Sequence, residues 1–383
     1  MRGGENMDER DDINQYRKKR KRKKSVVRLI VFILVAAAII IVIINWKNIF
    51  APLKDIGSKN GEGGFPINLT GSANYVMGEM GENFYLLTDT YLYTYNDNGA
   101  ELSNKQHGFQ NPVCSSNDKR ALVYDKNGKD MKVYSKNSEL YSKSFEDSIV
   151  FAQMGTDERC AVVTTSSRYS NFLYVLNSEG KQIFRWASPD EKIMQVCFST
   201  DDKSIYVSVV GESNGALLSS ILRFEVSGGE SETWRTAIGN NVSYSLQKCS
   251  DGIYAVTPDG AFLLNEQTGE IKASNSYSKE VCGITDTDGI RVTIFRDPVS
   301  NGEIANVYND ALEVSSAVSL DNSSVFDVRG GKLYVLNGNI LTVYDESLEK
   351  LKSYDLDDDY SDIKIIGKHA YLLGYNQVQR WEL

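Results

Sequence analysis

The sequence predicts an all-β fold, a β-propeller of four-stranded blades, with one transmembrane helix in front of it. Short strand patterns recur at nearly constant spacing, Asn-Gly and Asp-Gly pairs separate several of them, and one long apolar run lies near the N-terminus. Outside that run no long stretch has the 3.6-residue periodicity of a helix, which argues against α/β barrels and doubly wound folds.

The repeated unit has a strand rich in β-branched and aromatic residues, a turn, a second such strand ending in Asn, Asp or Glu, and a more polar third strand. Residues 332–356 show it most clearly, as KLYVL, Asn337-Gly338, ILTVYD and EKLKSYDL. Eight starts predict eight blades, and seven is the alternative because the copies at Phe84 and Ile290 are weak. The starts lie 37 to 48 residues apart, as is typical of propeller blades, at Phe84, Ala121, Ala161, Ile205, Ile253, Ile290, Leu333 and Ala370.

The turns and apolar runs of the repeats indicate how the strands pack. Nearly continuous apolar runs, such as residues 172–176 and 333–336, predict that neighbouring blades cover both faces of each sheet. Asn-Gly and Asp-Gly pairs tolerate the positive φ of type I′ hairpins, and we expect such turns at Asn98-Gly99, Asn127-Gly128, Asp259-Gly260, Asn301-Gly302 and Asn337-Gly338.

A further strand precedes the units and is expected to line a central channel, as at residues 149–155, 193–199, 325–330 and 363–368. The last copy ends the chain without an outer strand, whereas a spare strand at residues 65–70 precedes the first. We therefore expect the N-terminal strand to complete the C-terminal blade, because this pairing removes exposed sheet edges.

Residues 25–46 predict a membrane-spanning helix. Residues 29–44 contain no polar side chain, and counting from Ser25 gives the length needed to cross a hydrocarbon core about 30 Å thick. The basic octet at residues 17–24 predicts that the N-terminus stays in the cytoplasm. The expected order is a cytoplasmic tail (1–24), a transmembrane helix (25–46), a flexible linker (47–64) and an extracytoplasmic propeller (65–383).

A cleaved signal peptide is the alternative reading of the same segment. Ala36-Ala37-Ala38 resembles the small residues of a cleavage site, but six apolar residues follow it. Cleavage there would have to occur within the hydrocarbon core, so we favour an uncleaved anchor and localisation as a single-pass cell-membrane protein.

The charges divide sharply along the chain. Residues 1–28 hold 11 Lys and Arg against 5 Asp and Glu, a net charge of +6, and the rest holds 31 against 46, a net charge of −15. The acidic domain would repel phosphates, which argues against a nucleic-acid partner. The basic octet explains membrane orientation, and attraction to anionic lipid or an acidic cytoplasmic partner is a further possibility.

Several segments resemble known propellers. Residues 197–209 (CFSTDDKSIYVSV) resemble the inner turn of WD-repeat-like propellers, and residues 176–186 and 263–271 are similar to blade turns of quinoprotein-like propellers. The arrangement resembles bacterial membrane-anchored propellers whose domain has no assigned function. The Trp-Asp pair of true WD repeats is missing and the chain has four Trp, so the resemblance implies a fold and not an activity.

No residue is predicted to be catalytic, to bind a cofactor or to bind a metal. His107 and His369 are the two histidines, and no Cys-x-x-Cys, His-x-x-x-His, G-x-S-x-G or phosphate-binding motif occurs. Cys249 and Cys282 are a possible disulfide pair. The odd total instead favours small apolar side chains near the axis for the five cysteines, Cys114, Cys160, Cys197, Cys249 and Cys282.

Two polar features of the sequence each have a functional and a structural interpretation. The acidic segment 355–362 (DLDDDYSD) offers carboxylates that calcium accepts, but it lacks the ligand order of an EF-hand, so a solvated turn is favoured. Asn68, Asn241 and Asn322 match the glycosylation sequon, which carries weight only in a host that glycosylates.

Two function classes follow. The favoured one is a non-catalytic binding, sensing or scaffold module at the cell envelope, whose partner is an envelope protein, a peptide or a glycan. The alternative is an exported hydrolase or lyase acting on a polymer, for which carboxylates converging at the channel mouth would be the distinguishing feature.

Overall fold

The computed structural model describes residues 63–69, 74–287, 290–321 and 324–383. The expected tail 1–24, the expected transmembrane helix 25–46 and most of the linker 47–64 lie outside these ranges. Within them, no helix is long and apolar enough to cross a membrane.

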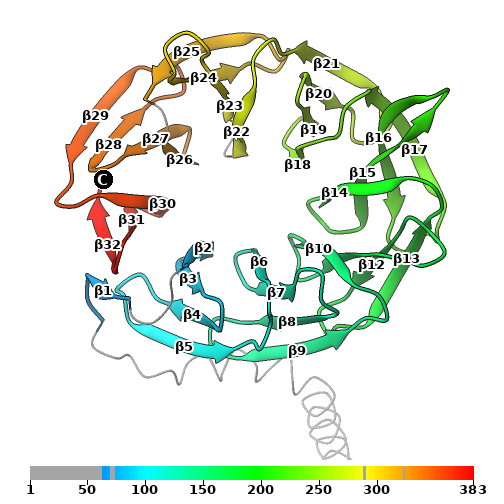
Figure 1. Ribbon diagram of the computed structural model, residues 1–383, viewed down its shortest axis with the longest axis horizontal. Helices are drawn as coiled ribbons and strands as arrows, with labels where there is room; N and C mark the ends of the chain where they lie inside the picture. Colours follow the sequence, from blue (N-terminus) through cyan, green and yellow to red (C-terminus); the bar gives the residue numbers. More distant parts are fainter. Residues whose placement is uncertain (1–62, 70–73, 288–289, 322–323) are drawn as a thin grey trace, which may run out of the picture. The chain divides into compact units, whose positions relative to one another are not determined.

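The described residues form eight four-stranded antiparallel sheets, arranged as the blades of a ring (Figure 1). From the innermost strand outward, blades 1 to 4 are β2 (Val76–Met80), β3 (Asn83–Leu87), β4 (Tyr91–Tyr95) and β5 (Glu101–Gln106); β6 (Pro112–Ser116), β7 (Ala121–Asp125), β8 (Asp130–Tyr134) and β9 (Glu139–Ser144); β10 (Ile149–Met154), β11 (Cys160–Thr164), β12 (Asn171–Leu176) and β13 (Gln182–Ser188); β14 (Lys192–Phe198), β15 (Ser204–Ser213), β16 (Ala216–Glu225) and β17 (Glu232–Gly239).

Blades 5 to 8 follow in the same order. They are β18 (Ser245–Cys249), β19 (Gly252–Thr257), β20 (Gly260–Leu264) and β21 (Ile271–Ser276); β22 (Val281–Thr287), β23 (Ile290–Arg296), β24 (Glu303–Tyr308) and β25 (Val314–Leu320); β26 (Val325–Arg329), β27 (Lys332–Asn337), β28 (Ile340–Tyr344) and β29 (Lys350–Asp355); β30 (Tyr360–Ile366), β31 (His369–Gly374), β32 (Gln377–Glu382) and β1 (Ile67–Asn68).

The strand prediction is confirmed in every blade. The eight expected starts fall within one residue of the starts of the second strands, β3, β7, β11, β15, β19, β23, β27 and β31. The four example channel strands correspond to the innermost strands β10, β14, β26 and β30. Eight blades, and not seven, form the ring.

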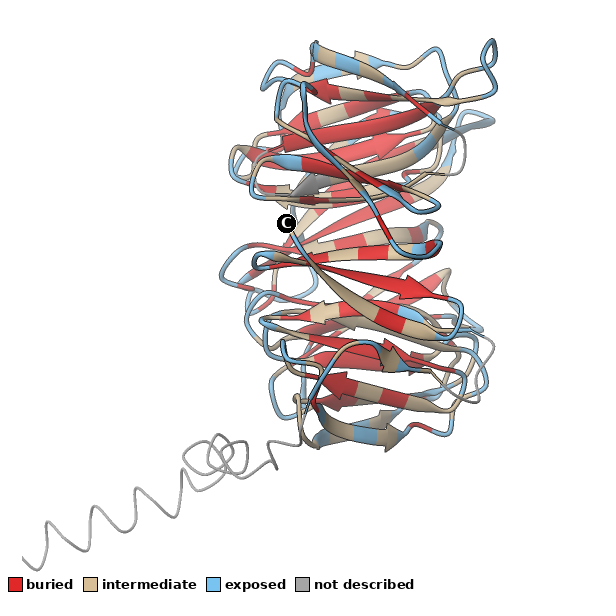
Figure 2. Ribbon diagram, turned by 90° about the vertical axis from the view of Figure 1, so that its left-hand side faces the viewer, coloured by how far each residue is buried: buried red, intermediate tan, exposed pale blue. Residues whose placement is uncertain are grey.

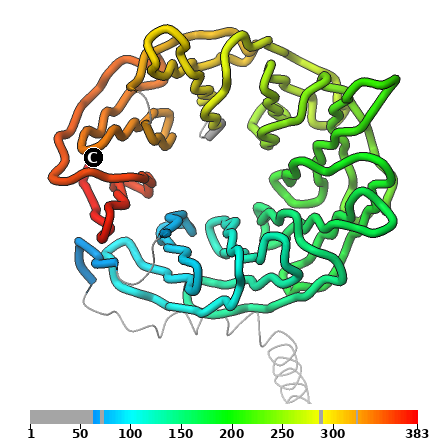
Figure 3. The backbone as a smooth tube through the Cα atoms, viewed as in Figure 1, coloured from blue at the N-terminus to red at the C-terminus, as the bar shows by residue number. Residues whose placement is uncertain are grey.

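The N-terminal strand closes the ring as expected. Ile67 pairs with Val378 and Asn68 with Gln377, so β1 is the outermost strand of blade 8 (Figure 3). The Phe65 ring lies 5.8 Å from Tyr371 in blade 8 and 6.3 Å from Phe84 in blade 1. The strand is shorter than expected because Pro66 has no N–H to donate to the ladder.

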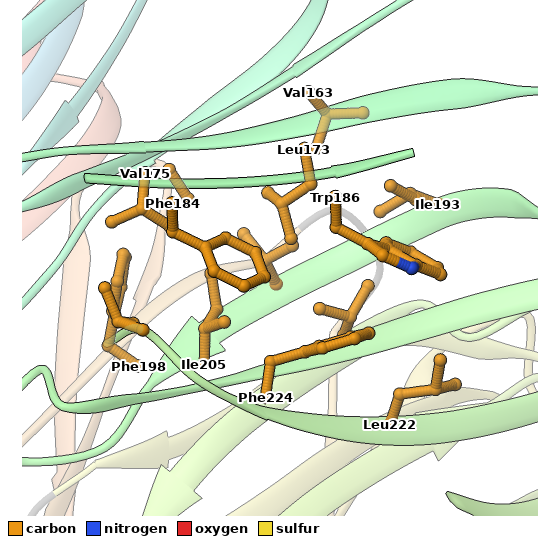
Figure 4. Close-up of a cluster of buried hydrophobic side chains, with 14 of the residues drawn as sticks. Val163, Leu173, Val175, Phe184, Trp186, Ile193, Phe198, Ile205, Leu222 and Phe224 are labelled. Carbon is orange, nitrogen blue, oxygen red and sulfur yellow. The ribbon is translucent and has the colours of Figure 1, made fainter. Parts of the chain in front are cut away.

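The core lies between blades, and buried residues concentrate in the second and third strands of the blades, such as β11 and β12 (Figure 2). All five residues of β11 are buried, as a strand covered on both faces requires. Trp186 of blade 3 packs on Phe224 of blade 4 with ring centroids 4.9 Å apart (Figure 4). The outermost strands, such as β5 and β21, alternate exposed and half-buried residues.

The prediction of type I′ turns at these five pairs is wrong. A type I′ turn needs positive φ at both central residues, but Asn98-Gly99, Asn127-Gly128, Asn301-Gly302 and Asn337-Gly338 have it at one residue each, and Asp259-Gly260 has it at neither. Asn214-Gly215, at the tip of β15 and β16, has it at both.

Most third strands end in a longer turn instead, which an Asn or Asp side chain stabilises. Asn96 Oδ1 accepts the N–H groups of Asn98 (3.1 Å) and Ala100 (2.9 Å). This bonding explains why the third strands end in Asn or Asp, and it recurs at Asn177, Asn265, Asn309 and Asp345.

Candidate functional site

The inner wall of the ring is formed by the innermost strands of the blades and carries two pockets. One, of about 370 Å³, is lined by residues of β2, β22, β26 and β30, four of which are charged. The other, of about 440 Å³, is lined by β10, β14, β18 and the loops at their ends. The strands therefore bring residues of blades far apart in sequence to one surface.

The charged pocket is held together by pairs between blades. Arg329 forms an ion pair with Glu79 and donates from Nε to the Ile365 carbonyl at 3.1 Å. Asp327 accepts the Ile365 N–H at 2.6 Å and lies 3.7 Å from Lys364 Nζ. Burial raises the pKa of Glu79, and the positive charge of Arg329 opposes that rise. These pairs tie blades 1, 7 and 8 together.

Carboxylates at the channel were the feature expected to distinguish an enzyme. The structure places Glu79 and Asp327 on the inner wall, each paired with a cation of another blade, Arg329 of blade 7 and Lys364 of blade 8. Cys197, which lines the second pocket, is a weak nucleophile because burial raises the pKa of its thiol. In the part of the chain that the structure describes, no three His, Cys, Asp or Glu side chains form a group that could hold a metal ion.

The two histidines lie apart. His107 is buried between blades 1 and 2; its Nδ1 accepts the Phe109 N–H at 3.0 Å and its Nε2 lies 3.1 Å from the Thr88 carbonyl oxygen. His369 begins β31 in blade 8. The structure does not bring them into one site.

The cysteine positions agree with the sequence analysis. Cys114, Cys197, Cys249 and Cys282 lie in innermost strands and Cys160 begins β11, and none of the five forms a disulfide bond. Burial raises the pKa of Cys114 to about 12 and that of Cys160 to about 11, so both stay protonated at neutral pH. The suggested bond between Cys249 and Cys282 is not formed.

The acidic segment is a surface turn, as favoured. Asp357, Asp358 and Asp359 are exposed, the Tyr360 hydroxyl donates to Asp357 at 2.8 Å, and Gln377 donates to Asp358 at 3.4 Å. Among the sequon residues, Asn68 lies in β1 and Asn241 between β17 and β18. Asn322 lies outside the described residues.

Several blades carry exposed apolar side chains at one face of the ring. We call it the loop face; it contains the connections between second and third strands and those between blades. Val299 is 92% exposed and Tyr375 is 99% exposed, each in a connection between a second and a third strand. Eleven large apolar side chains are exposed among the described residues, and six lie in or beside loop-face connections: Val76, Leu217, Tyr244, Val299, Ile340 and Tyr375.

The remaining five lie at the starts of outermost strands, on the outer wall at the opposite end: Leu140, Ile183, Ile271, Val314 and Leu351. The sequence analysis did not identify the loop face. Its available signal was a large apolar residue inside a turn, as in DPVSNG around Val299 and GYN around Tyr375.

Blade 4 extends the loop face with a long hairpin. Its strands β15 and β16 have ten residues each, whereas most other strands have five to seven. Residues 212–217 at its tip are exposed and include Leu217. Beyond the Lys192–Val210 and Ser219–Gly239 pairs, no strand of the described residues neighbours the hairpin on either side.

Solved structures with the same fold are similar to this chain only at low sequence identity. BamB from Moraxella catarrhalis aligns with a TM-score of 0.55 and 10% identity, and Sqt1 from Saccharomyces cerevisiae with 0.62 and 10%. Each alignment covers 83% of this chain and 98% of the other. A Dos1 propeller aligns at 0.57 with 12% identity, covering 83% and 95%. At such identity the likeness establishes the fold alone.

Comparison with curated proteins finds no match. A family model described as a family of unknown function, DUF5711, matches residues 65–383. The match spans all eight blades, including the N-terminal strand that closes the ring. The chain therefore belongs to the DUF5711 family, whose domain here is an eight-bladed propeller.

Proposed function

We propose that the propeller is a non-catalytic binding or scaffold module at the cell envelope, tethered by a transmembrane helix at residues 25–46, and that its loop face docks a protein partner. The observation that carries the proposal is the almost complete exposure of Val299 and Tyr375 at that face, where four other large apolar side chains are also exposed.

Physical chemistry supports a docking role for these side chains. Covering apolar groups with a partner removes them from water and stabilises the complex by about 25 cal/mol for each Å² buried. Loops on a rigid scaffold commonly carry function, because the scaffold fixes their positions before binding. The charged inner-wall residues, in contrast, are already paired within the ring.

Charge narrows the class of partner. Residues 63–383 hold 28 Lys and Arg against 44 Asp and Glu. An envelope protein with apolar groups surrounded by basic residues would complement the loop face, and opposite charge speeds encounter. A peptide or a glycan is a further ligand class, and the negative domain disfavours nucleic acid.

The tether supports binding at modest affinity, since confinement to the membrane raises the local concentration near other envelope components. Protease added to intact cells or protoplasts should remove the domain beyond Trp46 and spare the tail. Protection of the domain would contradict the orientation, and a soluble mature form beginning near Ile39 would contradict the anchor.

Site-specific photo-crosslinking tests the docking face. Photoreactive residues replace Val299 or Tyr375 on the loop face, and Gln267 or Ser347 in exposed turns of the opposite face, in the full-length chain within its native cells. We expect one discrete protein adduct from the loop-face positions and none from the others. Equal adducts from both faces, or adducts from the opposite face alone, would refute the proposal.

A further inference from the structure

The pocket of about 440 Å³ on blades 3 to 5 is a groove that runs the height of the inner wall. Tyr244, just before β18, lies at its loop-face end, and Thr156, just after β10, lies at the other. A strand of five or six residues spans roughly 17–20 Å. The groove therefore has the length of a short extended ligand.

Its walls are neutral although the domain is strongly acidic. Each of the three blades contributes one glutamine, Gln153, Gln195 and Gln247, and no carboxylate lines the groove. Lys248 is its one charged lining residue, and it is paired with Glu266 at 3.3 Å. The charged pocket elsewhere on the inner wall has the opposite character, with four ionised side chains.

The groove holds a hydrogen-bond acceptor without a donor. Gln247 Oε1 is buried and accepts no hydrogen bond, a state that costs about 1–3 kcal/mol when no partner is supplied. Gln195, in contrast, donates from Nε2 to the Tyr244 carbonyl at 3.3 Å. Because this oxygen is shielded from solvent, a ligand N–H reaches it only when the Gln247 side chain turns toward the groove.

The strand edges add groups of the same kind. β10, β14 and β18 are the innermost strands of their sheets, so each pairs with a neighbour on one side only. On the other side some backbone groups bond side chains of the ring, since the Met154 N–H donates to Ser115 Oγ at 3.0 Å and the Ile193 N–H donates to Asn171 Oδ1 at 3.1 Å, and the remaining groups have no partner strand. Glutamine amides and free strand edges both offer donors and acceptors that match peptide groups.

We propose that this surface, which we call the glutamine groove, binds an extended, uncharged peptide segment. A charged ligand would find no unpaired countercharge there. A saccharide would find one exposed aromatic ring, Tyr244, because Phe198 is buried. This inference goes beyond the proposed function, since the groove lies on the inner wall and not on the loop face.

Peptide binding to the full-length chain tests the inference. The probes are fluorescent, photoreactive heptapeptides drawn from Gly, Ser, Thr, Asn and Gln, together with matched pools carrying two Asp or two Lys. The groove variants are Gln153→Glu, Gln195→Glu and Gln247→Glu. The control is Gln182→Glu, which makes the same change on an exposed residue of the outermost strand β13.

We expect the uncharged pool to bind and its adducts to map to residues of β10, β14 or β18. Each groove variant should weaken binding about tenfold through lost hydrogen bonds and an unpaired charge, and Gln182→Glu should bind like the original chain. If a groove variant fails to fold, the adduct map of the unchanged chain decides whether the peptide binds in the groove.

The inference is overturned if no pool binds, if charged pools bind equally well, or if oligosaccharides displace the peptide. It is also overturned if the adducts map outside the groove or if the groove variants bind the peptide normally. Crosslinking from Val299 and Tyr375 is scored on the same preparations. Loss of peptide binding with intact loop-face crosslinks refutes the groove alone, and the reverse result refutes only the loop-face proposal.

Discussion

At the scale of single residues, the blades fit together through matched sizes at one repeated position. The turn after the third strand holds a residue with positive φ that faces the preceding blade. Gly269 (φ 75°) lies under Trp234, so that an added Cβ would come within 2.6 Å of the indole. Leu312 (φ 56°) occupies the equivalent position one blade later and is buried in a cluster that packs against Ala273. At both contacts, a large side chain on one blade thus meets a small residue on the adjacent blade.

This complementarity predicts that Gly269→Ala destabilises the protein more than Gly229→Ala. Gly229 (φ 91°) lies in the corresponding turn of blade 4 with no atom near a would-be Cβ, so its substitution costs only the left-handed backbone, about 1–2 kcal/mol. Gly269→Ala should cost about 2 kcal/mol more, because the methyl group displaces Trp234. Thermal and urea unfolding measure both, and equal losses would show that the contact with Trp234 contributes nothing.

His107 makes stability depend on pH. Burial lowers its pKa below the ordinary 6.5, and the charge of Lys132 acts in the same direction. Protonation would remove the acceptor that Nδ1 offers to the Phe109 N–H. The neutral ring makes its full contribution to the free energy of unfolding above about pH 6.5. This contribution declines as pH falls, since His107 takes up the proton in the unfolded chain at a higher pH than in the folded one.

We therefore expect the difference in unfolding free energy between the original chain and His107→Gln to be constant from pH 8 to about 6.5, and to decrease toward pH 5. Denaturant unfolding at each pH gives this difference, in which the titration of other groups cancels. A pH-independent difference, or one that grows on acidification, would contradict the assignment.

At the scale of elements, local pattern predicted strands well and turns poorly. The starts of the second strands were predicted within one residue, because a buried strand needs a run of β-branched and aromatic residues that the sequence displays. Turn type was predicted wrongly at Asn98-Gly99. That pair suits a two-residue hairpin, but Asn96 organises a longer turn through its own side chain. The Asn96 side chain, two residues before the pair, therefore decides which local arrangement forms.

The closing strand β1 supplies the prediction at this scale. Deleting residues 65–69 removes the partner of β32 and the Phe65 ring packed between Tyr371 and Phe84. We expect a loss of about 3 kcal/mol or more, since burial of one aromatic ring is worth that much. Deleting residues 48–62, before the first described residue, should leave the melting temperature unchanged. Coinciding melting curves for the two deletions would rule out closure by β1.

At the scale of the whole molecule, the sequence predicted the ring and its closure but not the surfaces on it. Blade number followed from the repeat spacing, and closure followed from a spare strand at one end and a missing strand at the other. The glutamine groove was not predictable from the pattern, because Gln153, Gln195 and Gln247 lie about 40 to 50 residues apart and meet only when three blades stack. Val299 and Tyr375 were overlooked because a turn in the sequence does not show how far its apolar side chain is exposed.

The central claim is that the loop face of the ring docks a protein partner. The affinity of the crosslinked partner, once purified, for full-length variants tests it most directly. Val299→Glu with Tyr375→Glu places charge on the loop face, and Ile271→Glu with Leu351→Glu makes the same change at exposed apolar residues of the outer wall. We predict that the loop-face pair weakens binding by at least about tenfold, with no change for the outer-wall pair. Equal affinities for the two variants, or a loss confined to the outer-wall pair, would contradict the claim.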